Sequence, residues 1–216
     1  MVRSFPAGSS GGPDGVRPKH ILDLVSCPVA GPKLLTALTS FVNLLLSGRC
    51  PRAISPILFG ANLIALSKKS GGVRPIAIGY TWRRIAAKCA NAFAVTKVAD
   101  YLYPLQVGVG VSGGCEAAVH ATRRFLDSMP IGHVIAKLDF SNAFNSIHRQ
   151  SVLSQVDRLV PELSAFCLSA YGSPSALKFG SRSIPSCEGV QQGDPLGPFA
   201  FLSYLAAHTS RFDLRA

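Results

Sequence analysis

VIAKLDFSNAFN (residues 134–145) and EGVQQGDPLGP (residues 188–198) are the two stretches of this 216-residue chain that decide its fold. The first is an apolar, β-branched run with the carboxylate of Asp139 at its end, and it predicts a buried strand over residues 133–138. The second is a dense Gly/Pro/Gln turn, followed by an apolar segment that predicts a helix over residues 199–208. An Asp at the end of a strand often only caps the next helix, so its role depends on its surroundings.

The composition predicts a globular protein with a negatively charged partner. Hydrophobic residues make up 48% of the chain, and 22 Lys+Arg against 11 Asp+Glu give a formal net charge of +11. Such an excess favours a phosphate-rich or acidic ligand and binding that weakens with salt, although a generic basic protein would show the same charge. The six cysteines form no C-x-x-C pair, which is typical of a reducing compartment rather than a zinc site or disulfide framework.

The N-terminus lacks the apolar core of a signal peptide, and no run of apolar residues is long enough to cross a bilayer. We therefore expect an intracellular protein with no membrane partner, in the nucleus or the cytoplasm.

The spacing of apolar residues predicts a mixed order of helices and strands. Helices are expected over residues 34–46, 80–102, 116–129, 151–160, 162–171 and 199–208. Residues 62–67 and 73–78 predict a hairpin around the loop 68–72, and residues 177–184 predict a second hairpin. Pro75 places its strand at a sheet edge. Since the order lacks βαβ regularity, the expected fold class is α+β.

Several of these motifs together resemble the reverse transcriptase domain of non-LTR retrotransposons and group II introns. They are SGGPDGVRP (residues 10–18), RPI (74–76) after a basic hairpin, Asp139 with Phe144, and QQGDPLGP (191–198). The resemblance covers most of residues 8–210 and implies the fingers and partial palm of a right-hand polymerase. It divides the chain into a lead-in (1–18), a fingers-like region (19–104) with the basic hairpin 62–78, and a partial palm (105–216).

The resemblance implies an RNA-directed DNA polymerase that uses Mg²⁺, an RNA template, a DNA primer and dNTPs. It makes Asp139 the catalytic metal ligand, with the backbone carbonyl of Phe140 as a further ligand. Hard oxygen ligands suit Mg²⁺ bound to triphosphate oxygens. It also makes Phe144 the ring that excludes a ribose 2′-hydroxyl. Without the resemblance, Phe144 is most simply a core residue.

Nucleotide-binding roles follow from the same resemblance. Gln192 and Gly193 would line the incoming nucleotide, and Lys68 or Lys69 with Arg74 would bind its phosphates. Arginine offers bidentate geometry to a phosphate, whereas two lysines beside Gly-Gly can equally form a solvated turn. Paired arginines on predicted helices are expected to be solvated or to contact nucleic-acid phosphates; these are Arg83, Arg84, Arg123 and Arg124.

The resemblance ends before the Asp-Asp hairpin and the thumb of such polymerases. After Gly193 the acidic residues are Asp194, inside the turn, and Asp213, which lacks the hairpin context. We therefore expect a truncated chain that lacks the C-terminal palm and thumb of its polyprotein and does not polymerise. The alternative from a different class is a non-catalytic, basic, nucleic-acid-binding remnant.

A second alternative rests on the glycines of GVGVSG (residues 108–113). This G-x-G-x-x-G precedes a predicted helix and a strand ending in Asp139, as in a dinucleotide-binding oxidoreductase. Against it, Pro104 lies where the first strand should run, and Asp139 follows the glycines by more than the usual spacing of about 20 residues.

Overall fold

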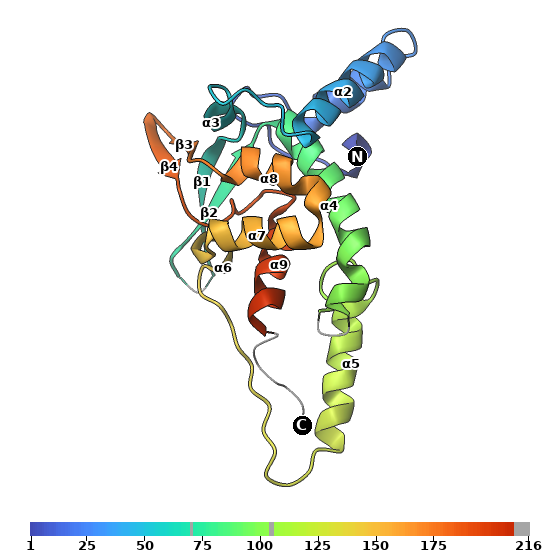
Figure 1. Cartoon of the computed structure of the whole chain (residues 1–216), viewed down its shortest axis with the longest axis vertical. Coiled ribbons are helices and arrows are strands. Elements are labelled where there is room, and N and C mark those ends of the chain that lie inside the picture. The colour runs from blue at the N-terminus through green and yellow to red at the C-terminus, as the bar shows by residue number, and fades with distance from the viewer. Residues whose placement is uncertain (70, 104–105, 210–216) are drawn as a thin grey trace.

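The computed structural model describes residues 1–69, 71–103 and 106–209, which form a mixed helix and strand fold around one four-stranded sheet (Figure 1). The helices are α1 (Pro18–Val25), α2 (Gly31–Leu46), α3 (Ser55–Leu58), α4 (Thr81–Leu102), α5 (Gly114–Asp127), α6 (Ala143–Ser146), α7 (Arg149–Leu159), α8 (Ser164–Tyr171) and α9 (Gly197–Thr209). Short 3₁₀ turns cover Val2–Ser4 and Pro161–Leu163. The strands are β1 (Ala61–Ser67), β2 (Val73–Gly79), β3 (Ser175–Phe179) and β4 (Arg182–Ser186). Among the described residues, no helix is long and apolar enough to cross a membrane.

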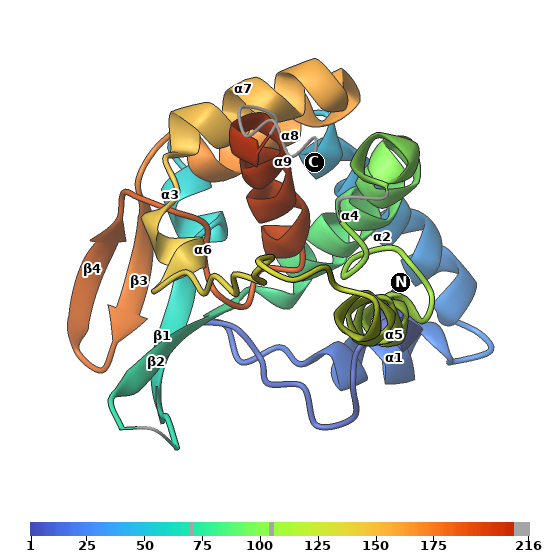
Figure 2. The ribbon, with the colours of Figure 1, turned by 90° about the horizontal axis from the view of Figure 1, so that it is seen from below.

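The sheet has the order β2-β1-β3-β4, and it confirms both predicted hairpins. Pro75 lies on the edge strand β2, as predicted, where its missing N–H costs no ladder hydrogen bond. β1 pairs in parallel with β3 through Ala61 opposite Leu177 and Asn62 opposite Lys178. The sheet therefore joins strands from residues 19–104 and 105–216. The parallel pairing spans these two residue pairs. Both hairpin tips lie at the lower left of Figure 2, but in Figure 1 the tip of β3–β4 points up and that of β1–β2 points down.

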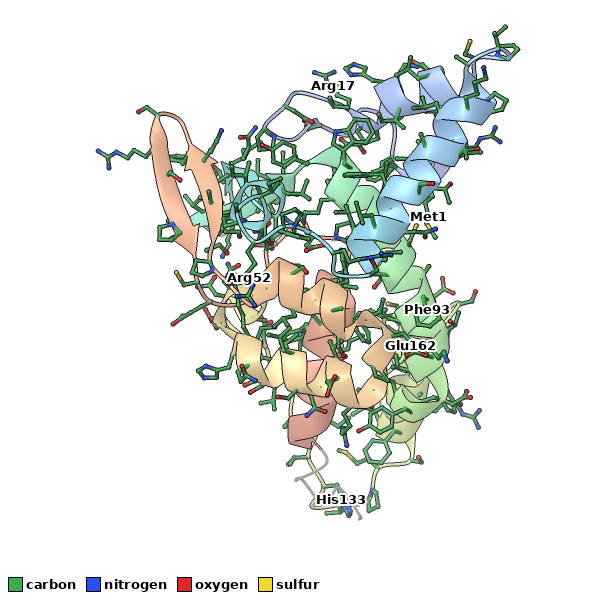
Figure 3. The ribbon with its side chains drawn as sticks, turned by 45° about the horizontal axis from the view of Figure 1, so that its top comes forward. Met1, Arg17, Arg52, Phe93, His133 and Glu162 are labelled. Atoms are coloured by element: carbon green, nitrogen blue, oxygen red, sulfur yellow. The ribbon has the colours of Figure 1, made fainter. Side chains whose placement is uncertain are left out.

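Helix α4 is the central element of the core. It buries a stripe of small residues, and both α2 and α9 pack against it. Helices α7 and α8 complete this core with fully buried apolar side chains such as Val156 and Phe166. Phe93, in contrast, is 38% exposed and lies on the outer side of α4 (Figure 3).

The N-terminal lead-in lies against the start of α4. Trp82 Nε1 donates to Asp14 Oδ2 at 3.1 Å, and Arg84 Nη1 donates to the Ser10 carbonyl at 2.7 Å. The Gly-Pro-Asp-Gly segment therefore fastens the lead-in to the helix that carries the core.

The predicted strand over residues 133–138 is wrong. These residues form an extended segment that belongs to no strand of the described chain, and Val134 and Leu138 are 86% and 80% exposed. Together with α5 they form an arm that leaves the body of the molecule (Figure 1), with His133 at its far end (Figure 3). An apolar, β-branched run has a tendency to form a strand, but a strand also needs a ladder partner, and none of the described strands lies beside it.

The glycine-rich loop at 108–113 does not belong to a dinucleotide-binding unit. It follows the helix α4 rather than a strand, and no strand follows α5 in the described part of the chain before α6. Pro104 lies outside the described residues. Within the loop, the side chain of Gln106 bonds the backbone N–H and carbonyl of Val109 at 2.7 and 3.0 Å. The structure therefore lacks the βαβ order that the oxidoreductase alternative requires.

Limited trypsin digestion should cut the native protein first after Lys137. This side chain is exposed in a segment without ladder hydrogen bonds, so the backbone can enter a protease without unfolding the core. Mass spectrometry of the first fragments would identify the site, and Lys137→Gln should remove this cut. Protection of Lys137 until the whole protein is digested would show instead that residues 133–138 form a paired strand.

Candidate functional site

A cleft of about 480 Å³ lies where the β1–β2 hairpin meets the segment that enters α6. Its lining comes from three stretches that are far apart in the sequence. They contribute Lys68, Arg74 and Pro75, then Asp139 to Asn145, then Gln192. Only the fold brings these stretches to one place.

Six of the eight residues predicted for the site line this cleft. They are Lys68, Arg74, Asp139, Phe140, Phe144 and Gln192. Lys69 and Gly193 are both exposed and lie outside the lining. Lys69 belongs to the β1–β2 hairpin, whereas Gly193 belongs to the Gln-Gln-Gly turn and lies against Ala77 of β2. Sequence reasoning did not single out Ser141, Asn142 or Asn145, which also line the cleft.

The Gln-Gln-Gly turn is attached to the outer edge of β2. The backbone N–H of Ala77 donates to the Gln192 carbonyl at 2.8 Å, so the turn satisfies a donor of the edge strand. Gly193 has a φ of +118°, and a Cβ on it would lie 2.6 Å from the Ala77 carbonyl oxygen. Glycine is therefore required here by close approach to β2, and this approach places Gln192 in the cleft.

Phe144 forms a fixed wall of the cleft. Its ring packs against that of Phe201 with centroids 5.2 Å apart, and a Cβ on Gly197 would lie 3.6 Å from it. The Phe144 carbonyl accepts a hydrogen bond of 2.8 Å from the N–H of Val190, which ties α6 to the Gln-Gln-Gly turn. A ring held on two sides can act by steric exclusion, which is what the sequence resemblance asks of this residue.

Arg149 holds the chain that leads into the turn. Its guanidinium donates to the carbonyls of Gly189 and Ser186, both at 2.8 Å, and to the Ser186 hydroxyl at 2.7 Å. It also lies over the ring of Tyr171, 5.3 Å from the centroid. Burial lowers the pKa of Arg149. The side chain of Arg149 thus supplies hydrogen-bond donors to the backbone carbonyls of the segment that leads into the turn.

A buried ion pair lies directly beneath the turn. The side chains of Arg83 and Asp194 are each 2% exposed, and one Asp194 oxygen accepts hydrogen bonds from both Arg83 Nη2 and the Tyr171 hydroxyl. The other oxygen accepts the N–H of Leu196 at 3.0 Å. Burial, and after it the charge of Asp194, raises the pKa of Tyr171 well above its ordinary value, so this phenol stays protonated and donates.

The remaining donors of Arg83 extend the pair into a network. Arg83 Nη1 donates to the Phe59 carbonyl and to Gln191 Oε1, both at 2.8 Å. Gln191 Nε2 in turn donates to the Phe59 carbonyl at 2.9 Å and to Ser175 Oγ at 3.0 Å. The first glutamine of the turn is therefore structural, whereas the second, Gln192, faces the cleft.

The sequence prediction that Arg83 is either solvated or a phosphate contact is wrong. A signal was present, since position 83 falls on the same helical stripe as the buried Ala86, Ala87, Ala90 and Ala94. Because arginine is charged, the sequence predicted an exposed side chain at this position. The partner that permits its burial, Asp194, lies 111 residues away in the sequence.

The cleft combines two cations with one carboxylate, Asp139. Lys68 and Arg74 provide donors for an anionic ligand, and Asp139 is exposed to the cleft. In the described part of the chain no group of three or more His, Cys, Asp and Glu residues could hold a metal ion. A pair of Mg²⁺ ions needs more oxygen ligands than Asp139 and a carbonyl supply, so these residues do not make a two-metal site.

No family model matches the chain. The chain is similar in sequence to a protein of a retrotransposable element. That relative is the Retrotransposable element SLACS 132 kDa protein of Trypanosoma brucei gambiense, with 26% identity over 208 residues. The matched region covers 93% of this chain and only 17% of the relative.

Removing Asp194 should cost far more stability than removing an exposed acid. Asp194→Ala leaves the charge of Arg83 buried without its counter-ion, which should lower the free energy of unfolding by about 3–5 kcal/mol. Glu162→Ala is the matched control, because it removes the same charge from the half-exposed pair with Lys97, and should cost at most about 1 kcal/mol. Urea unfolding followed by circular dichroism measures both. Equal losses would contradict the structural role of the buried pair.

Stability should fall as the pH rises above about 9, in part through Cys167. Burial raises the pKa of this thiol from 9.0 to about 12, so its contribution is complete below pH 9 and is lost as the pH rises toward the folded pKa. Between about pH 8 and about pH 10, the wild type should lose about 1.4 kcal/mol more than Cys167→Ala. Urea unfolding at both pH values tests this. Cys115→Ala, at an exposed position, should keep the wild-type dependence.

Proposed function

We propose that this chain is the fingers and part of the palm of an RNA-directed DNA polymerase of a retrotransposon, and that its cleft takes the incoming dNTP. The observation that carries the proposal is the convergence of six residues, predicted from separate motifs, on one cleft. The similarity to a retrotransposable element protein supports the retrotransposon origin.

Each wall of the cleft suits one part of a nucleotide. Lys68 and Arg74 lie on the β1–β2 hairpin, whose loop can approach the triphosphate from outside the sheet. Phe144 packs against Phe201 and would contact the sugar of the nucleotide. A 2′-hydroxyl on that sugar would clash with the ring, which its packing holds in place. Gln192 carries a side-chain amide that can donate to and accept from the sugar or base.

In the intact polymerase, the proposed reaction is attack of a primer 3′-hydroxyl on the α-phosphate of the dNTP, with pyrophosphate leaving. Asp139 and the carbonyl of Phe140 would contribute ligands to Mg²⁺, which supplies charge neutralisation at the phosphates. Because the described residues form no complete metal site, we expect this chain alone to bind dNTPs without extending a primer.

The second candidate is a basic nucleic-acid-binding protein without nucleotide specificity. The formal charge of +11 favours it, since charge alone binds phosphate backbones. The two candidates differ in the cleft: a charge-only binder should not distinguish dNTPs from rNTPs or depend on particular cations.

Nucleotide binding should depend on the cleft cations rather than on net charge. Calorimetric titration with dNTP and Mg²⁺ should show affinity weakened at least about tenfold in Lys68→Ala/Arg74→Ala. Lys33→Ala/Arg49→Ala removes the same charge from exposed positions outside the cleft lining and should bind like the wild type. Phe144→Ala should bind rNTPs and dNTPs with similar affinity.

Two results would contradict the proposal. Equal weakening in both charge pairs would favour the charge-only binder. Primer extension by the wild-type chain would contradict the inference that its metal site is incomplete.

A further inference from the structure

Helix α5 is exposed along almost its whole length. It continues the line of α4 below the body of the molecule (Figure 1), and every residue from 115 to 128 is exposed. The larger apolar side chains among them are Val119 at 50%, Phe125 at 47% and Leu126 at 50% exposure. A helix of 14 residues is marginally stable in water unless its apolar side packs against something, so α5 has a surface in need of a partner.

The apolar residues of α5 lie on one side of the helix. With about 3.6 residues per turn, the spacing brings them onto a single face, and the charged residues lie on the opposite side. We call this surface the α5 face; its residues are Cys115, Ala118, Val119, Thr122, Phe125 and Leu126. The Thr122 hydroxyl donates to the Ala118 carbonyl at 2.8 Å, so the face can be covered without leaving this donor unpaired.

The charges of α5 favour a second copy of this chain as the partner. Glu116 and Asp127 balance Arg123 and Arg124, so α5 has no formal net charge in a chain of +11. If two α5 helices pack antiparallel, Glu116 of one copy lies level with Arg123 of the other, on the same side of the contact. In a parallel pair each of these two charges would lie beside its like, which is unfavourable.

The chain also has surface to spare for such a contact. Its solvent-accessible surface is 13725 Å², whereas a compact monomer of 22.8 kDa exposes about 9,600 Å². The excess is on the order of 4,000 Å². An obligate homodimer buries about 2,000–5,000 Å² over both chains, so the excess on one chain covers its share of such an interface.

We propose that the α5 face is a dimer interface, on which α5 of a second copy of this chain packs antiparallel about a two-fold axis. Phe125 of one copy then lies opposite Cys115 of the other, and Ala118 lies opposite Thr122. The two-fold axis repeats each contact and closes the assembly at two chains. The dimer goes beyond the proposed function and does not depend on it, because α5 contributes no residue to the lining of the cleft.

Sedimentation equilibrium of the full chain measures the dimer. At about 10 µM and above, the wild type should sediment at twice the mass of the 22.8 kDa chain. Phe125→Glu should raise the Kd for dimerisation at least about a hundredfold, because it places a charge in an apolar contact that occurs twice. Leu168→Glu is the matched control, since it places the same charge on an exposed leucine of α8, and it should dimerise like the wild type. A cooperative urea transition would confirm that both variants fold.

Exchanging two charges tests the orientation of the helices. Glu116→Arg should raise the Kd about tenfold, because each copy then places an arginine beside Arg123 of the other. Glu116→Arg/Arg123→Glu restores the pair with its charges exchanged, and its Kd should return to within about threefold of the wild-type value. If the double variant dimerises no better than Glu116→Arg, the antiparallel contact is wrong.

Several other results would overturn the dimer. They are a wild type that stays monomeric at all concentrations, a dimer that Phe125→Glu leaves intact, and an equal loss of dimer in Leu168→Glu. Binding of a monomeric chain to anionic lipid vesicles through Phe125 would assign the α5 face to a membrane surface instead. Titration of the same variants with dNTP separates the two proposals: absence of dNTP binding from a dimeric wild type would count against the proposed function alone.

Discussion

The buried pair of Arg83 and Asp194 is the constraint on which the rest of the structure depends. It joins the first turn of the central helix α4 to the turn that carries Gln192. Both terminal nitrogens of the Arg83 guanidinium and the Tyr171 hydroxyl donate hydrogen bonds there. A buried charge is tolerated only when it is paired and fully hydrogen-bonded, so this arrangement fixes the turn in one position. The backbone N–H of Ala77, on the edge strand β2, then bonds the Gln192 carbonyl of the turn.

The cleft is a consequence of that placement. Once the turn is held against β2, Val190 bonds Phe144, and α6 brings Asp139 beside the basic hairpin. The cleft therefore depends on one buried ion pair and on the attachment of the turn to β2.

Local patterns predicted both hairpins and the helices α2, α4, α5, α7, α8 and α9, because the information for them lies within a few residues. They missed α1, α3 and α6. Pro75 marked an edge strand correctly, and Pro161 separated α7 from α8. The segment at 133–138 shows the limit of such patterns: its composition favours a strand, but pairing is a property of two segments. Arg83 shows the opposite error: the residue was predicted to be exposed and is buried. Its charge favoured an exposed position, although its helical spacing placed it on the buried face of α4.

By itself, the sequence determined which side chains could serve a nucleotide: two cations on a hairpin, one carboxylate, a phenylalanine and a glutamine. Only the tertiary structure decided that Lys68, Asp139 and Gln192 share a cleft, that Lys69 and Gly193 stay outside its lining, and that Gln191 is structural. The physical reason is the range of the forces involved. Helix periodicity and turn chemistry act over a few residues, whereas a buried charge selects its partner across 111 positions of the chain.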